Sequence, residues 1–307
     1  MFDNNPEEHY LKQGDPNKPT YYIIRHMNEA AELSDIYRMT AGHIWYALSK
    51  SWLPVVDMKN YSNLYLPPEK LGAENSWEYY FEQPLRIGLE QAYNGENVVL
   101  SDGFKAERYP DYSRNLLEKT DDTLAQWRTL VKWGFLKIKP ALTEEINEIR
   151  EELFLPKERV LGVLLRGKNY PDEKNINQPV SPSAEFATTV AAAKFEEWKC
   201  NKIFLMTKDS VLLDMFKNKF ADKCTLLDQL DFEWYDSDAM VNSERSVSEN
   251  ESFLRAKKYL TQIVLLSLCN CLVAERCGDS TNVMLMATKF ANTYFFNLGI
   301  YGMFNLN

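Results

Sequence analysis

Residues Val160–Tyr170, VLGVLLRGKNY, decide the fold that we expect for this chain. The run VLGVLL is apolar throughout, which is typical of a β-strand buried on both faces. Such strands belong to parallel sheets whose two faces are covered by helices. The polar turn that follows begins with Arg166 and Gly167. It is therefore expected at the carboxyl end of the strand, the edge where sheets of this class bind their ligands.

Downstream of this stretch, helical and strand patterns alternate to the end of the chain. Ser183 is a suitable N-cap for the first helix. We expect helices over Ser183–Trp198, Ser210–Phe220, Phe253–Leu268 and Thr281–Lys289, and strands over Lys202–Met206, Thr225–Leu227, Cys271–Ala274 and Thr293–Asn297. This alternation predicts a parallel sheet with helices on both faces.

Upstream, a second α/β unit is expected. A strand over Tyr21–Ile24, a turn at Gly42, a helix from Ala41 onward and a strand over Trp52–Val56 form a βαβ pattern. Helices over Glu74–Leu85, Leu116–Trp133 and Thr143–Phe154 and a strand over Asn97–Leu100 complete the expected elements. We therefore divide the chain into a flexible N-terminus (1–20), one α/β domain (21–155) and a second, Rossmann-like domain (156–307).

The bulk composition excludes several classes of protein. A net charge of -9 provides no electrostatic surface for nucleic acid. The longest apolar run, around Ile263–Ala274, is too short and too interrupted to form a transmembrane segment. Five scattered cysteines indicate reduced thiols and a cytoplasmic location. With only His9, His26 and His43 available, we expect no metal site.

The first candidate site is the turn Arg166–Gly167–Lys168. A guanidinium at the end of a buried strand suits bidentate recognition of phosphate, and Lys168 adds a second positive charge. Gly167 would let a phosphate approach the backbone. An arginine that forms a salt bridge at a domain surface is the alternative.

Two further turns follow strands in the same half. Thr207 and Asp209 precede a helix, where Asp209 could act as its N-cap or accept hydrogen bonds from a ribose or a base. The turn Gly278–Thr281, which includes Ser280, opens the next helix, whose free N–H groups and dipole favour phosphate. The charge of Asp279 opposes this.

Taken in order, these turns resemble the fucosyltransferase superfamily, in the form of its bacterial members. This superfamily includes core α1,6-fucosyltransferases, nodulation-factor fucosyltransferases and protein O-fucosyltransferases. VLGVLLRGKNY with Gln178–Pro179 resembles the first family motif, IFLMTKDSVLL the second, and YLTQIVLLSLCNCLVAERCGDSTNVMLMA the third. The stretches LPVVDMKNYSNLYL and NSWEYYFEQP resemble the acceptor-side domain. The chain departs from the first motif at Gly167–Lys168, Asn169 and Gln178.

The resemblance implies a GT-B fold, with two Rossmann-like domains facing a cleft. It further implies an inverting transferase that needs no metal or other cofactor and uses a GDP-sugar, usually GDP-fucose, as donor. Arg166 then stands where the family grips the donor diphosphate, with Asp209, Ser280 and Thr281 as further donor contacts. A glycan or glycolipid acceptor, a role in polysaccharide biosynthesis and peripheral membrane association also follow from the resemblance alone.

The general base is assigned to one of several carboxylates. Asp172 and Glu173 lie in the loop after Arg166, although they could equally be solvated loop residues. Asp57, at the end of the expected WLPVV strand, is the alternative on the acceptor side, together with Gly42 and His43. Two other readings stay open: a non-catalytic relative that binds a nucleotide sugar or glycan, and a GT-B transferase with a different nucleotide sugar.

Overall fold

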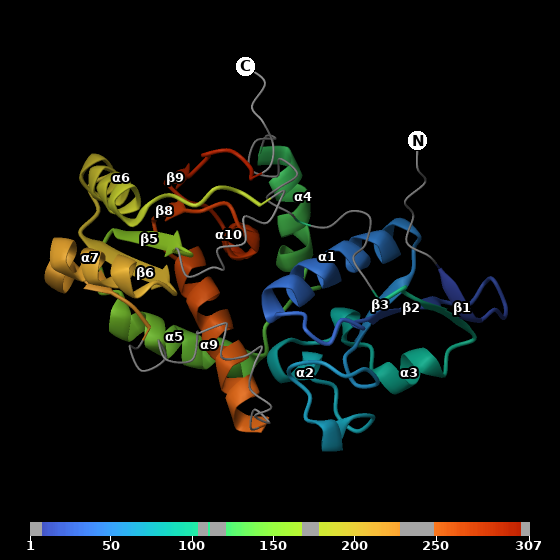
Figure 1. Ribbon diagram of the computed structural model, residues 1–307. Coiled ribbons are helices and arrows are strands. Elements are labelled where there is room, and N and C mark those ends of the chain that lie inside the picture. Colours follow the sequence, from blue (N-terminus) through green and yellow to red (C-terminus); the bar gives the residue numbers. More distant parts are fainter. Residues whose placement is uncertain (1–7, 104–109, 111–120, 168–177, 228–248, 302–307) are drawn as a thin grey trace. The chain divides into compact units, whose positions relative to one another are not determined.

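The computed structural model describes residues 8–103, 110, 121–167, 178–227 and 249–301 (Figure 1). The chain forms two compact units. The first comprises Met1–Glu145 and Val247–Tyr259, and the second comprises Ile146–Ser246 and Leu260–Asn307. The expected boundary at residue 155 lies close to this division, but residues 247–259 cluster with the first unit.

The first unit is built on a four-stranded sheet in the order β1-β4-β2-β3. Its strands are β1 (His9–Lys12), β2 (Thr20–Arg25), β3 (Leu53–Asp57) and β4 (Asn97–Leu100). β2 pairs in parallel with both β3 and β4, and β1 is antiparallel to β4. β1 lies in the segment that we expected to be flexible. Its pairing with β4 therefore orders part of that segment.

Helices cover both faces of this sheet. Successive side chains of a strand point to opposite faces, so neighbouring residues of β2 contact different helices. Ile23 of β2 packs with Ala92 of α3 (Leu89–Tyr93), whereas its neighbour Tyr22 contacts α1 (Leu33–Ser49). The remaining helical segments are η1 (Pro68–Lys70), α2 (Trp77–Tyr80), η2 (Pro84–Arg86) and α4 (Asp121–Lys132). The expected helix over Glu74–Leu85 is thus reduced to α2, with a short 3₁₀ turn at Pro84.

The helix around Gly42 also differs from the expectation. We placed a glycine turn there, but α1 begins nine residues earlier, at Leu33, and Gly42 lies inside it. The Glu32 side chain makes no capping hydrogen bond, and the first N–H of α1, at Leu33, donates instead to the distant Tyr65 hydroxyl at 2.7 Å. The helix is held mainly by burial, since every residue from Ile36 to Ile44 is buried, and a capping pattern cannot reveal this.

The second unit carries a five-stranded, fully parallel sheet in the order β7-β6-β5-β8-β9. Its strands are β5 (Val160–Leu165), β6 (Lys202–Thr207), β7 (Cys224–Thr225), β8 (Cys271–Ala274) and β9 (Asn292–Phe295). Every residue of β5 is buried, as the apolar run predicted. The expected parallel α/β arrangement is confirmed for this unit.

Helices again lie on both faces of the sheet (Figure 1). They are α6 (Ala184–Glu197), α7 (Ser210–Phe220), η4 (Ala221–Lys223) and α10 (Gly278–Met286), together with α5 (Pro140–Leu153) from Ile146 onward and α9 (Glu249–Ser267) from Leu260 onward. Side chains of α6 and α7 share one core with Leu161, Val163 and Leu165 of β5. On the other face, Leu266 of α9 approaches Gly162 so closely that a side chain there would crowd it. Within the described residues, none of the helices is long and apolar enough to span a membrane.

Candidate functional site

The carboxyl edge of the second sheet gathers the three turns singled out from the sequence. β5 ends at Leu165, which is paired with Thr207, the last residue of β6. Leu164 is paired with Ala274, the last residue of β8. Because the three parallel strands end at the same level, the residues that follow them lie side by side at one edge. The register therefore brings the Arg166, Asp209 and Glu275 turns together.

Glu275 holds the backbone of the Arg166–Gly167 turn. This carboxyl group is 4% exposed, and its Oε1 accepts a hydrogen bond of 2.8 Å from the backbone N–H of Arg166. The backbone N–H of Gly167 also donates to it. Ser181 Oγ donates to the other oxygen, Oε2, at 2.7 Å. Sequence reasoning missed Glu275, because its partners are more than ninety residues away along the chain.

Asp209 packs against the other side of the same turn. Gly167 has φ of +80°, and a Cβ atom at this position would collide with the Asp209 side chain. Glycine is therefore required at residue 167 both for its backbone angle and for its lack of a side chain. The turn is confined between Glu275, after β8, and Asp209, after β6.

Asp209 is the N-cap of α7. Its Oδ1 accepts hydrogen bonds from the backbone N–H groups of Val211 and Leu212, at 2.8 and 3.1 Å. Its own N–H donates to Thr207 Oγ1 at 3.2 Å. The capping role expected from the sequence is therefore present. Asp209, which is hydrogen-bonded to Thr207, also lies beside Gly167.

The start of α10 is a third part of this edge. Ser280 Oγ both accepts from the Cys277 N–H and donates to the Cys277 carbonyl, at 3.0 and 2.9 Å. Thr281 Oγ1 donates to the same carbonyl at 3.2 Å. Both hydroxyls are buried and engaged within the turn. What this turn presents toward solvent is the positive end of the helix and the half-exposed residues Arg276, Gly278 and Asp279.

The charges at this edge act on one another. Burial raises the pKa of the Glu275 carboxyl, whereas its three hydrogen bonds and the positive charge of Arg166 lower it. Burial and, to a smaller extent, Asp279 raise the pKa of Cys277 to about 11, against the influence of Arg166. The Arg166 guanidinium is therefore close enough to act electrostatically on both groups.

Three of the expected site residues lie outside the described part of the chain. They are Lys168, predicted to bind the donor, and the two proposed bases Asp172 and Glu173. Gln178 and Pro179 are described, and Pro179 forms an isolated antiparallel bridge with Ile300.

The acceptor-side residues expected in the first unit are all buried. Asp57 is fully buried, and each of its oxygens already accepts two hydrogen bonds, from residues that include Asn60 and Tyr93. Gly42 and His43 are buried inside α1, where His43 Nδ1 lies 3.0 Å from the Tyr22 hydroxyl. The structure thus shows hydrogen bonds within the protein for Asp57 and His43 and burial for Gly42, and their assignment as a base and as acceptor contacts stays a prediction.

His26 is the residue of the first unit that sequence reasoning overlooked. It directly follows β2, and its Nε2 lies 2.8 Å from Thr40 Oγ1, while Nδ1 is buried without a hydrogen-bond partner. Burial, together with repulsion from His43, lowers the pKa of His26 to about 3. The imidazole is therefore neutral at physiological pH. In the sequence, the only feature that singles out His26 is its position directly after an expected strand.

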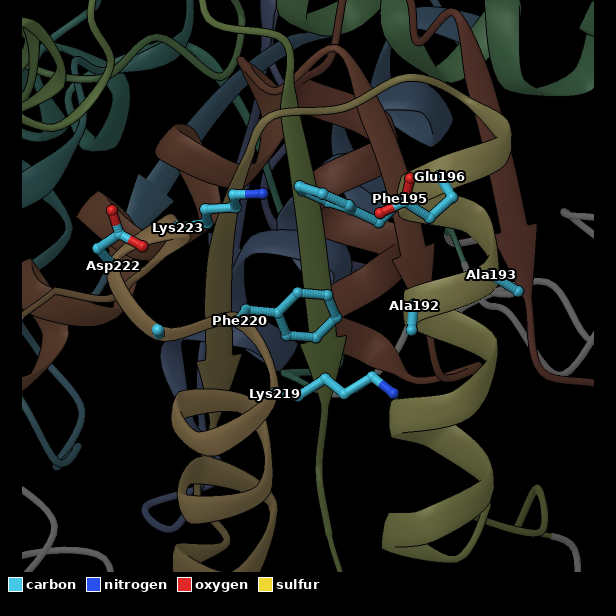
Figure 2. A pocket seen from close by; sticks show the side chains of 9 residues that line it. Ala192, Ala193, Phe195, Glu196, Lys219, Phe220, Asp222 and Lys223 are labelled. Carbon is cyan, nitrogen blue, oxygen red and sulfur yellow. The ribbon is translucent and has the colours of Figure 1, made fainter.

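A surface pocket lies away from these turns. Figure 2 shows Phe220, the last residue of α7, and Lys223, which follows it in η4, beside Phe195 of α6. The end of α6 is next to the beginning of β5, because Arg159 Nε donates to the Trp198 carbonyl. The pocket is therefore at the amino edge of the sheet, opposite Arg166.

Comparisons with known proteins bear on the fold. No family model matches the chain, and no curated protein matches it. Solved structures of the fucosyltransferase NodZ do match. The crystal of NodZ α-1,6-fucosyltransferase soaked with GDP-fucose is 15% identical, with a TM-score of 0.51 over 88% of this chain and 93% of that chain.

Two related crystals give the same result. NodZ co-crystallised with GDP is 12% identical, with a TM-score of 0.51 over 88% of this chain and 93% of that one. NodZ from Bradyrhizobium is 14% identical, with a TM-score of 0.51 over 93% and 97%. The resemblance to the fucosyltransferase superfamily is thereby confirmed at the level of the fold.

The confinement of the Arg166–Gly167 turn predicts an unusual cost for Gly167→Ala. Any alanine at positive φ loses about 1–2 kcal/mol. Gly134 has φ of +81°, and no atom lies within 4 Å of the point that a Cβ atom would occupy there, so Gly134→Ala carries that cost alone. We expect Gly167→Ala to lose at least about 1 kcal/mol more, because of the collision with Asp209. Urea denaturation of both variants measures the difference, and equal losses would show that Asp209 does not confine the turn.

Proposed function

We propose that this chain is a glycosyltransferase that moves a sugar, with fucose as the first candidate, from a GDP-sugar to a glycan or glycolipid acceptor. The observation that carries the proposal is the Arg166–Gly167 turn at the carboxyl edge of the second sheet. Its place beside the start of α10 suits a diphosphate, which guanidinium groups and helix N-termini bind. The NodZ structures that share the fold were determined with GDP-fucose and with GDP.

The proposed reaction inverts the anomeric carbon. The acceptor hydroxyl oxygen forms a bond to this carbon on the face opposite the diphosphate, while the bond from the carbon to the diphosphate oxygen breaks. The electron pair of that bond stays on the departing diphosphate, and the hydroxyl proton passes to a base. Arg166, Lys168 and the start of α10 would stabilise the developing negative charge without a metal.

The base remains assigned to Asp172 or Glu173, which follow Arg166 in the sequence. The structure supports this choice indirectly, because Asp57 has its lone pairs engaged. The pH–rate profiles of Asp172→Asn and Glu173→Gln decide between the two. A basic limb that is unchanged in both variants would exclude both.

We propose a cytoplasmic location from the state of the cysteines, and a membrane contact from the proposed acceptor. All five cysteines are free thiols, which agrees with a reducing, cytoplasmic environment. An acceptor built at a membrane surface would call for peripheral association, which sedimentation with vesicles of bacterial lipid can test. Recovery of the protein from the periplasm of its host would contradict the cytoplasmic assignment.

A nucleotide screen by thermal unfolding is the direct test of the donor. A ligand at a hundredfold its dissociation constant stabilises the folded state by about 2.7 kcal/mol. We expect GDP to raise the melting temperature, whereas UDP, CMP and ADP leave it unchanged, and we expect EDTA to have no effect on the GDP result. Stabilisation by UDP alone would identify a different nucleotide sugar, and loss of the GDP effect with EDTA would contradict metal independence.

Arg166→Ala should lower sugar transfer by about 100-fold or more, which is the scale of losing one group that stabilises charge in the transition state. Arg150→Ala, which changes an exposed arginine of α5, is the matched control and should retain activity. Turnover of GDP-fucose in the presence of a panel of glycans provides the measurement. Tight binding of GDP by the wild type without any turnover would identify a non-catalytic relative instead.

A further inference from the structure

Glu275 is a buried carboxylate at the edge of the sheet where we place an anionic ligand. A buried carboxylate is costly unless it is hydrogen-bonded. Its hydrogen bonds come from the backbone N–H groups of Arg166 and Gly167 and from the hydroxyl of Ser181. Two of the donors belong to the first motif and Ser181 follows it by two residues, whereas Glu275 follows β8. The carboxylate thus joins the segments on both sides of residues 168–177 to the neighbouring strand.

These contacts fix the base of the Arg166 side chain. The N–H of Glu275 donates to the Leu164 carbonyl at 3.0 Å, which continues the pairing of β8 with β5. The carboxylate of the same residue then binds the next two N–H groups along the chain, at Arg166 and Gly167. The backbone from Leu164 to Gly167 is therefore held at each step by β8 or by Glu275.

From this geometry we propose that Glu275 is a positioning residue of the donor site, which orients Arg166 for a diphosphate by holding the backbone of its turn. The inference rests on the proposed function, because it assumes that Arg166 binds the donor. A diphosphate bound by a preplaced guanidinium avoids the entropic cost of ordering that side chain and its turn on binding. Glu275 itself does not contact the donor in this proposal.

The hydrogen-bond pattern does not require Glu275 to be charged. Oε1 accepts from the N–H of Arg166, while Oε2 faces the hydroxyl of Ser181, which can either donate or accept. A glutamine could accept the Arg166 N–H through its carbonyl and donate to Ser181 Oγ through its amide. Glu275→Gln should therefore keep the turn in place, whereas Glu275→Ala leaves the N–H groups of Arg166 and Gly167 without this partner.

The stability of Glu275→Gln follows from the direction of the pKa shift. Burial raises the pKa of Glu275, so the folded state binds its proton more tightly than the unfolded state does. The stabilisation by this proton is present at low pH and is lost as the pH rises through the folded-state pKa. Wherever Glu275 is ionised, its carboxylate therefore costs folding free energy, although Arg166 offsets part of the cost. Cys277 and Asp279 are other titratable groups nearby. Glu275→Gln should melt no lower than the wild type.

The test measures GDP affinity by calorimetry in the full-length chain. We expect Glu275→Ala to weaken GDP binding by at least about tenfold, as for the loss of buried hydrogen bonds, and Glu275→Gln to stay within about threefold of the wild type. Glu158→Gln is the matched control, because Glu158 also accepts a backbone N–H, that of Leu155, but precedes β5 at the opposite edge. Should Glu275→Ala fail to fold, Glu275→Asp, whose carboxylate is one methylene further from both N–H groups, replaces it.

A double-mutant cycle separates positioning from a general structural role. If Glu275 acts through Arg166, then Glu275→Ala should weaken GDP binding much less in an Arg166→Ala background than in the wild type. Additive effects, or a Glu275→Ala variant that binds GDP as tightly as the wild type, would overturn the inference. A wild-type protein that binds no GDP at all would instead refute the proposed function.

Discussion

The arrangement on which the candidate site depends is a two-residue turn held between two buried carboxylates. Glu275 binds the N–H groups of Arg166 and Gly167, and Asp209 occupies the space that a side chain at residue 167 would need. Each carboxylate also accepts hydrogen bonds next to its own strand. Glu275 accepts one from the Ser181 hydroxyl, and Asp209 accepts two from the first N–H groups of α7. The position of the Arg166 backbone is therefore a consequence of how three neighbouring strands end.

Much of this second unit could be predicted from the sequence, because its signals are local. The apolar runs of β5, β6 and β8 fell within a residue or two of the observed strands. Ser183 caps α6 through the N–H of Phe186, and Asp209 caps α7, both as expected from residue type and position. Parallel pairing then follows from the alternation of strands with helices, and it brings the three turns to one edge without further information.

The parts that could not be predicted depend on contacts between distant residues. Nothing local marks Glu275 as a partner of Arg166, since the two are joined only by the register of β5 and β8. Asp57 has the position of a catalytic carboxylate, at the carboxyl end of a parallel strand, yet its hydrogen bonds with Asn60 and Tyr93 engage it structurally. His43 is a similar case. Its burial inside α1 could not be foreseen, because the sequence did not show that the helix begins at Leu33.

The local chemistry also reconciles an acidic chain with an anionic ligand. A net charge of -9 would repel a diphosphate at long range, but at physiological ionic strength charges are screened beyond about 8 Å. The same three turns carry positive groups, which are Arg166, Lys208, Arg276 and the start of α10, and the carboxylates Asp209, Glu275 and Asp279. Every N–H group that donates to Asp209 or Glu275 offsets part of its negative charge. Anion affinity at this edge is therefore governed by how fully those two carboxylates are hydrogen-bonded within the protein, and not by the charge of the chain as a whole.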